Sequence, residues 1–155
     1  MLEQQSEALD ELNRLAVEFF MLADRAEVIQ GKLYLMGGAW DRQYVVDFAQ
    51  PVLVSFAIGI RVPWNATNRE HRLRITVETA DGQMVNNFAL EAGFAAGRPA
   101  VAQPGESQRV VVAIPLVGIV FPGAGMYFGK AAINGELSQS IEFHLMAAPP
   151  GARPL

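Results

Sequence analysis

The feature that most constrains the fold is a β-hairpin signal between residues 121 and 146. Asn134-Gly135 separates two strand-like runs, and Pro122-Gly123 marks a corner before the first of them. An Asn-Gly pair is compatible with a two-residue type I′ loop, or with a three-residue loop that has glycine in the left-handed conformation. Either loop predicts two antiparallel neighbouring strands with Gly135 at positive φ.

The side-chain pattern of this segment favours the three-residue loop. That loop places Tyr127 opposite Ile141 and separates an apolar face from a polar one, whereas the two-residue loop sets Lys130 and Gln139 beside apolar side chains. Since strand side chains alternate between faces, a register slip is costly along the whole strand. The expected apolar face is Tyr127, Gly129, Ala131, Leu137, Ile141, Phe143 and Leu145, and the expected polar face is Lys130, Ser138, Ser140, Glu142 and His144.

Tyr127 has the placement of a tyrosine corner. It stands at the head of a strand, five residues after Pro122. In Greek-key sandwiches such a tyrosine packs its ring inward, and its hydroxyl is bonded to the preceding loop. We therefore expect the Tyr127 hydroxyl to hold the corner before the hairpin.

The rest of the chain after residue 16 also has the residue patterns of short strands. Two apolar runs in residues 17–40 flank a Gln30-Gly31 turn, and residues 51–62 alternate as a half-buried strand does. Further strands are expected at 71–79, at 83–90 after an Asp81-Gly82 turn, and at 110–121, which is apolar on both parities and so reads as a central strand bent at Pro115. Residues 91–106 read as a long connection. The pattern predicts an all-β fold, an antiparallel β-sandwich of immunoglobulin-like or Greek-key type.

Residues 1–16 differ in character from the strand-like remainder of the chain. They contain no glycine or proline, and Leu2, Leu9, Leu12 and Ala16 recur on a seven-residue pattern that Gln5 interrupts. We expect a short N-terminal helix that acts as an association helix, or else a frayed acidic extension, because helices of this length are marginal alone. The expected organisation is a helical extension at 1–16, a β-sandwich domain at 17–148 and a flexible tail at 149–155.

Charge and composition exclude several classes of function. The net charge is −4, of which residues 1–16 carry −3, so the body is near neutral and has no basic stripe to bind nucleic acid. The chain has no cysteine, which excludes disulfides, thiol catalysis and cysteine-bound zinc. No apolar stretch is long enough to span a membrane and no secretory signal is evident, so a cytoplasmic location and no membrane association are expected.

The sequence contains few residue patterns that support catalysis. Gly123, Gly125 and Gly129 follow an apolar strand but precede another strand, where dinucleotide binding would need a helix. His71 is expected at the inner rim of its strand and His144 on the outside, and neither has a partner at metal-ligand spacing. No nucleophile elbow or calcium-loop spacing occurs. We predict no catalytic residue, no metal site and no cofactor.

One constellation is suited to binding. Both tryptophans lie beside hydrogen-bonding side chains in loops or at strand ends, a mixture that binding surfaces favour. We predict one surface patch, with the alternative that each tryptophan caps an open end of the core. The predicted patch comprises Trp40, Asp41, Arg42, Trp64, Asn65, Asn68 and Arg69.

Several short motifs resemble a known family. They are Leu22-Ala23-Asp24, Gly31-Lys32-Leu33, Gly37-Gly38-Ala39-Trp40-Asp41, Val62-Pro63-Trp64, Asn68-Arg69, His71-Arg72 and Asp81-Gly82. In these motifs, roughly residues 17–146 are similar to a group of uncharacterised bacterial proteins classed as a domain of unknown function. The resemblance implies no activity, cofactor or catalytic residue, and it leaves the N-terminal helix outside the shared pattern.

Two functions are compatible with these patterns. The first is a non-catalytic protein-binding or assembly module, whose partner is another protein or a second copy bound through the N-terminal helix. The alternative is a small-molecule-binding enzyme, a hydrolase or isomerase, with a site built from scattered Asp, His and Arg. A deep pocket with converging titratable groups would distinguish the enzyme.

Overall fold

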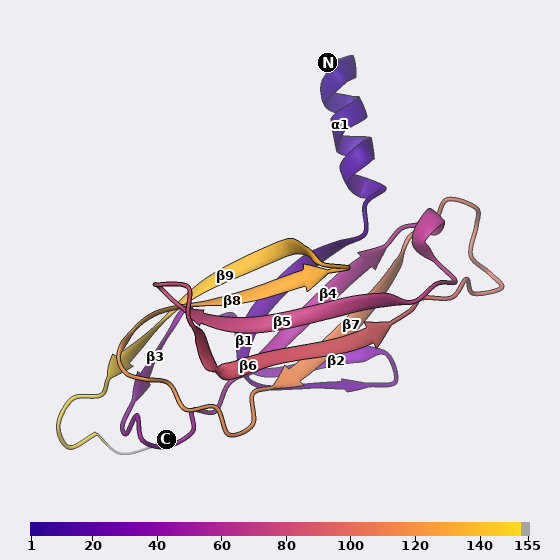
Figure 1. Cartoon of the computed structure of the whole chain (residues 1–155). Helices are drawn as coiled ribbons and strands as arrows, with labels where there is room; N and C mark the ends of the chain where they lie inside the picture. Colours follow the sequence, from indigo (N-terminus) through magenta and orange to yellow (C-terminus); the bar gives the residue numbers. More distant parts are fainter. Residues whose placement is uncertain (153–155) are drawn as a thin grey trace.

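The computed structural model describes residues 1–152, and in these residues two packed β-sheets form the body from which one helix projects (Figure 1). The helix is α1 (Leu2–Leu12). The first sheet has the strand order β2 (Lys32–Gly38), β1 (Ala16–Ile29), β4 (Ser55–Val62) and β7 (Gln108–Pro115). The second has the order β3 (Arg42–Val45), β9 (Glu136–Ala147), β8 (Gly125–Ile133), β5 (His71–Thr79) and β6 (Met84–Phe94). The predicted all-β sandwich with a short N-terminal helix is confirmed.

The core lies between the two sheets. Its largest fully buried side chains include Phe56 from the first sheet and Phe143 from the second, with Phe121 from the loop before β8. The rings of Phe121 and Phe143 meet edge to face, at 6.1 Å between centroids. One strand pair departs from the expected antiparallel arrangement, because β3 pairs parallel to β9. The immunoglobulin-like arrangement of the strands stays a prediction.

The prediction of a three-residue loop in the β8–β9 hairpin is wrong. Ile133 pairs with Glu136 across a two-residue turn, in which Asn134 and Gly135 have φ values of 52° and 86°. A β-bulge then shifts the register, so that Tyr127 lies opposite Phe143 rather than Ile141. The bulge restores the inward parity of the apolar side chains that a regular two-residue hairpin would have lost.

The consequences of the bulge are local. Leu137, expected on the apolar face, lies on the turn side of the bulge and is 61% exposed. The adjacent Ser138 accepts a hydrogen bond through Oγ from the backbone N–H of Val17 at 2.9 Å. The bulge therefore also joins the start of β1 to β9. Beyond it, Phe143 and Leu145 are buried while Glu142 is exposed, as predicted.

The predicted tyrosine corner is confirmed. Tyr127 is 3% exposed, and its hydroxyl donates to the carbonyl oxygen of Gly123 at 2.5 Å. Its ring stacks on Phe143, with 5.8 Å between the centroids. Burial raises the pKa of the Tyr127 phenol above its ordinary value, and the bond to Gly123 opposes that shift in part.

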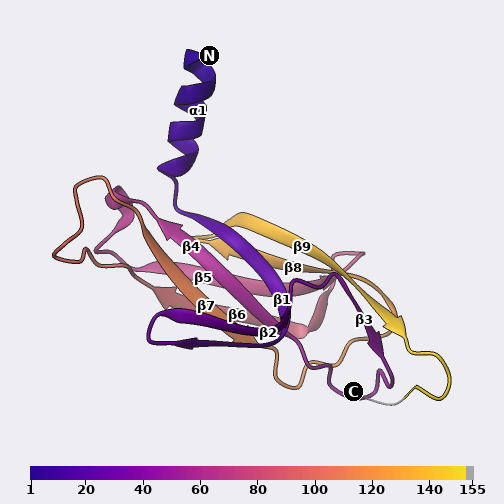
Figure 2. The same ribbon diagram turned by 180° about the vertical axis from the view of Figure 1, so that it is seen from behind.

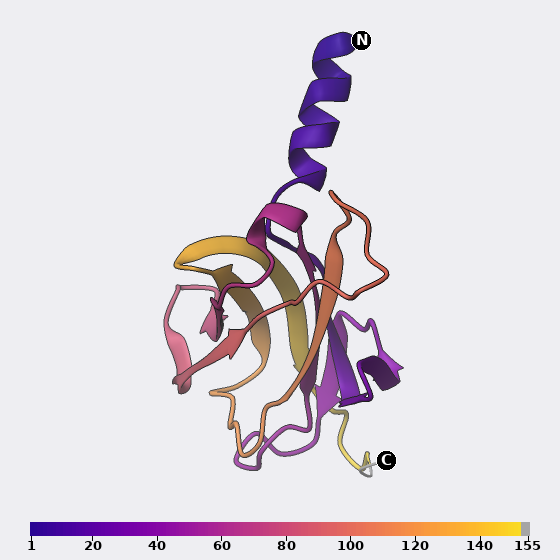
Figure 3. The ribbon, with the colours of Figure 1, turned by 90° about the vertical axis from the view of Figure 1, so that its right-hand side faces the viewer.

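The β1–β2 hairpin turns through Gln30-Gly31, as predicted, but it does not simply extend the first sheet. We use the name flap for residues 24–38, which bend back across the outer face of that sheet (Figures 2 and 3). Leu33 of the flap packs on a cluster of small side chains formed by Ala23, Ala26 and Ala57. These alanines let the flap approach the sheet closely.

The bend has a visible cause at Asp24 and Gly37. Ala23 pairs with Gly38 and Arg25 with Met36, but the position between them leaves the ladder. Gly37 has a φ of +60°, and a Cβ there would collide with the Asp24 side chain. The glycine is required because the chain is left-handed and in close contact at the same point.

The flap explains two further differences from the sequence prediction. β4 was expected to be half-buried, yet Ser55 and Ala57 on its outer side are 3% and 0% exposed, and Leu33 of the flap packs on the cluster that contains Ala57. The segment 110–121 was expected to be a central strand, but β7 is the last strand of the first sheet and pairs only with β4. Pro115 ends β7 instead of bending it.

The helix occupies only part of the predicted 1–16 extension. No residue of α1 is buried, and β1 already begins at Ala16. The predicted boundary at residue 17 and the tail at 149–155 stay predictions, and residues 153–155 of that tail lie outside the described residues.

Candidate functional site

The structure separates the predicted patch into two groups. Trp40, Asp41 and Arg42 lead into β3, which pairs with the end of β9 at Arg42 and His144. Trp64 lies in the short 3₁₀ helix η1 (Trp64–Ala66), which leads into the start of β5. In β8, Gly125 adjoins the β3 end and Ile133 adjoins the start of β5. The two groups are therefore at opposite ends of the second sheet, where Figure 1 shows β3 and η1, and the prediction of one continuous patch is wrong.

Around Trp64 the polar groups are used to hold the loop. Arg98 lies over the Trp64 ring, with its Cζ 3.8 Å from the centroid. The same guanidinium donates to Thr67 Oγ1 at 2.6 Å and to the carbonyl oxygen of Trp64 at 2.8 Å. Arg69 donates to the carbonyl oxygen of Asn65. The Arg98 bonds connect residues 64–69 to the 95–107 connection, while the side chains of Asn65, Asn68 and Arg69 are exposed.

His71 belongs to the same end and is also satisfied internally. It is 5% exposed, at the predicted inner rim, and its Nε2 lies 2.7 Å from the carbonyl oxygen of Ala66. Because a carbonyl can only accept, Nε2 carries the proton, and Nδ1 accepts from Asn134 Nδ2 at 3.1 Å. Asn134 in turn accepts from the backbone N–H of Arg72 at 2.9 Å. His71 therefore links two loops and presents no free ring nitrogen.

Asn68 adds a backbone constraint to this loop. It has a φ of +59°, and its N–H donates to the carbonyl oxygen of Ala96 at 2.8 Å.

Arg98 was missed by the sequence interpretation, because it lies in a segment rich in alanine, glycine and proline that resembled a simple connection. Its one signal was that it is the sole charged residue in residues 92–105.

At the other end Trp40 is a core cap. Its ring meets Phe143 edge to face at a centroid distance of 6.3 Å, and its Nε1 is buried without a hydrogen-bond partner. Asp41 and Arg42 are exposed and bond to each other at 3.2 Å. The hydrogen bond and the positive charge of Arg42 lower the pKa of the Asp41 carboxyl.

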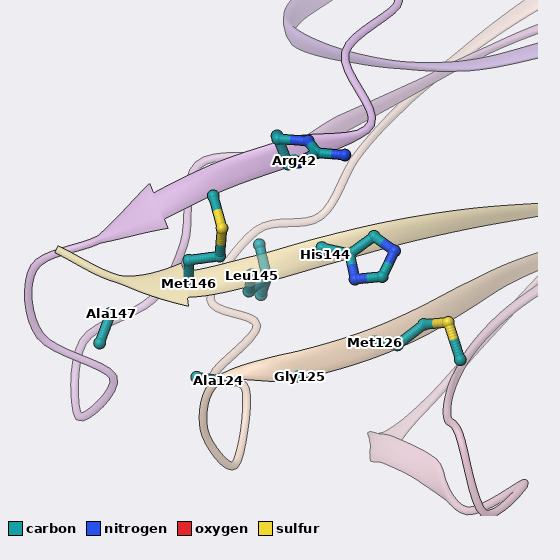
Figure 4. A pocket seen from close by; sticks show the side chains of 8 residues that line it. All are labelled: Arg42, Ala124, Gly125, Met126, His144, Leu145, Met146 and Ala147. Atoms are coloured by element: carbon teal, nitrogen blue, oxygen red, sulfur yellow. The ribbon is translucent and has the colours of Figure 1, made fainter.

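Beside Arg42 the outer face of the second sheet is hollowed. The depression has a volume of about 490 Å³, and Arg42, His144 and Met126 line it from three neighbouring strands (Figure 4). The remaining lining is apolar or backbone. His144 bonds to Glu142 at 3.2 Å on the outside of β9, as its parity predicted. Among the described residues, no serine, threonine, aspartate or glutamate side chain lines the depression.

Residues 1–152 lack two other kinds of site. They contain no group of three His, Asp or Glu side chains close enough to hold a metal ion. α1 is far too short to cross a membrane, and the described part of the chain contains no other α-helix.

Comparison with known proteins places the chain by family. No curated protein matches it. A family model does match over residues 18–146, which cover β1 through nearly all of β9 and leave α1 outside. Several of the short motifs are now explained by geometry, with Asp24 and Gly37 at the bend of the flap and His71 of β5 bonded to the Trp64 loop. The chain belongs to the family of unknown function DUF6941.

Proposed function

We propose that the protein is a non-catalytic assembly module that associates with a second copy of itself through α1. The observation that carries the proposal is the exposure of the helix. None of its residues is buried, and it projects from the body in all three views of the chain (Figures 1–3). Leu2, Leu9 and Leu12 are 84%, 60% and 55% exposed.

The helix is amphipathic, which supports pairing along one face. At 100° per residue Leu2, Leu9 and Leu12 lie on one side, and the carboxylates of Glu3, Glu7, Asp10 and Glu11 lie on the other. Two copies can therefore bury their leucines while their acidic groups stay in water. A solitary helix of this length is marginal in water, so contact with a partner would stabilise it.

The base of the helix is attached to the body. Arg61 of β4 donates through Nη2 to the carbonyl oxygen of Glu11 at 2.8 Å, and its Nη1 lies 3.5 Å from the Glu18 carboxylate. Glu18 also bonds to Arg109 of β7 at 2.5 Å. A cation at the carboxyl end of a helix interacts favourably with its dipole. These contacts support a helix that projects in a defined direction.

The expected association is weak. Full burial of a leucine contributes roughly 1.5–3 kcal/mol, so six leucines in a helix pair contribute at most roughly 9–18 kcal/mol. The loss of translational and rotational freedom on association costs roughly 4–15 kcal/mol. At the middle of both ranges the gain exceeds the cost by only about 4 kcal/mol, so the mass should change with concentration over an accessible range.

Sedimentation equilibrium of the full chain tests the proposal. We expect the wild type to form a reversible oligomer, and Leu9→Lys with Leu12→Lys to shift it to monomer. Gln4→Lys with Glu7→Gln is the control, because it changes the charge by the same +2 on the opposite face. A wild type that is monomeric at every concentration, or equal weakening by both pairs, would show that α1 does not mediate self-association.

The connections between the sheets support an immunoglobulin-like arrangement as a further part of this proposal. The chain crosses from the first sheet to the second between β2 and β3, between β4 and β5 and between β7 and β8, and it crosses back between β3 and β4 and between β6 and β7. The tyrosine corner heads β8, the strand that follows the last crossing into the second sheet. A crystal structure of the chain, compared in strand order with solved immunoglobulin-like domains, tests this assignment.

A further inference from the structure

The free edge of β2 is the least protected sheet edge in the described part of the chain. Every residue of β2 except Leu33 is exposed. Tyr34 and Met36 are 53% and 70% exposed. A free edge presents unpaired N–H and C=O groups that another strand can bond, so proteins usually protect it.

The other edge strands carry such protection. β3 has four residues. β7 ends at Pro115, and its residues from Val110 to Ala113 are partly covered. In β6, Asn86 and Asn87 are left-handed, and the Asn86 carboxamide, oriented with its nitrogen toward the Val120 carbonyl, bonds to both Val120 O (2.8 Å) and Val120 N (3.0 Å). Bulges and covering loops are common ways to block edge pairing.

The turn determines which residues of β2 direct their backbone N–H and C=O groups toward β1 and which direct them toward the free edge. Ile29 pairs with Lys32 across the two-residue turn Gln30-Gly31. The pair next to such a turn is hydrogen-bonded, and the bonding then alternates along an antiparallel ladder. Tyr34 therefore uses its backbone groups on Glu27, its partner in β1, and Leu33 and Leu35 direct theirs toward the free edge.

We propose that β2 is a second self-association surface, at which the β2 strands of two copies pair antiparallel about a two-fold axis through Tyr34. In this register Leu33 lies opposite Leu35 of the second copy, and the two pairs supply four backbone hydrogen bonds. Lys32 faces Met36, so that no like charges are directly opposed. The left-handed Gly37 lies outside the paired segment.

This surface is independent of α1. The helix and the flap lie on different sides of the body (Figures 1 and 3). Each contact would be symmetric and would use the same patch on both copies. Two different symmetric contacts on one chain link copies into an open array rather than a closed dimer. The β2 contact therefore goes beyond the proposed function, which needs only α1.

Disulfide trapping tests the register, because the chain has no cysteine of its own. In the proposed pair Tyr34 faces Tyr34 at a non-hydrogen-bonded position, where Cβ atoms are within disulfide reach. We expect Tyr34→Cys to form a covalent dimer under mild oxidation. Met36→Cys is the matched control, because the two positions 36 would lie about 13 Å apart, beyond that reach.

A proline variant tests the backbone bonds. Leu35→Pro removes an N–H that faces the free edge and is not needed within the flap. Added to Tyr34→Cys, it should slow cross-linking by about tenfold or more, because two of the four interchain bonds are lost. The hydrogen-exchange protection of residues 24–36 shows whether the flap of the variant remains folded. If it falls, Leu35→Ala, which restores the N–H, should recover rapid cross-linking.

The test is made in the full chain, with and without Leu9→Lys and Leu12→Lys. Cross-linking of Tyr34→Cys that persists in that background separates the β2 contact from association through α1. No cross-link with Tyr34→Cys, or equal yields with Met36→Cys, would overturn the proposal. An added extended peptide that binds the β2 edge of the Tyr34→Cys variant, with no dimer formed, would also overturn the proposal. It would assign the edge to another partner.

Discussion

The β1–β2 and β8–β9 hairpins have similar turns but differ in what packs against their strands. Gln30 and Gly31 have φ values of 49° and 72°, close to the 52° and 86° of Asn134 and Gly135. Yet β8 and β9 have strand neighbours on both sides, whereas β2 is an exposed edge. The comparison teaches that turn chemistry sets how a hairpin closes, while the surroundings decide whether it supplies core or surface.

Truncation of one large side chain in each hairpin should show the greatest contrast. Phe143 is 0% exposed and contacts three other aromatic rings, so Phe143→Ala should lower the free energy of unfolding by about 3–5 kcal/mol. Tyr34→Ala in the flap should change it by less than about 0.5 kcal/mol at concentrations where the protein is monomeric. Urea denaturation monitored by fluorescence measures both. Similar losses would mean that the flap is part of the cooperative core.

Valine at the second turn residue should sharpen the comparison. A β-branched side chain at positive φ costs about 1–2 kcal/mol. Gly135→Val should lower global stability by that amount, and Gly135→Asn should lower it less. Gly31→Val carries the same strain, but it should act mainly by opening the flap, which hydrogen exchange would detect as lost protection in residues 24–36. Equal global effects of the two valine variants would contradict a separately opening flap.

The sequence predicted the features that depend on local chemistry. The three turns with glycine at the second position, the inward Tyr127 and the inner-rim His71 follow from residue types and period-two parity. The three-residue loop was wrong because parity assumes an unbroken strand. A single extra residue near Ser138 shifts the parity of the strand, and the amino acids around Ser138 do not indicate this bulge.

The errors at longer range have a different physical origin. β7 is apolar on both parities because a flap from elsewhere in the chain contacts it, and this mimics a central strand. The separation of Trp40 from Trp64 depends on β3 joining β9 at its far end. Arg98 gains its role from the Trp64 ring, 34 residues away. Such relations are properties of topology, and spacing along the chain does not contain them.

The smallest expected effect concerns the hydroxyl of Tyr127, which is on a buried tyrosine, whereas Tyr34 of the flap is exposed. Tyr127→Phe keeps the stacked ring and removes the bond to Gly123, so it should cost about 0.5–1.5 kcal/mol at neutral pH. Burial raises the pKa of Tyr127 in the folded state, so above the ordinary value near 10 the unfolded chain releases the proton first. The stability of the wild type should therefore fall as the pH rises through this range. Urea midpoints between pH 8 and 11 should converge for Tyr127→Phe and the wild type, because the variant lacks this titrating group, and parallel curves would contradict a buried neutral phenol at the corner.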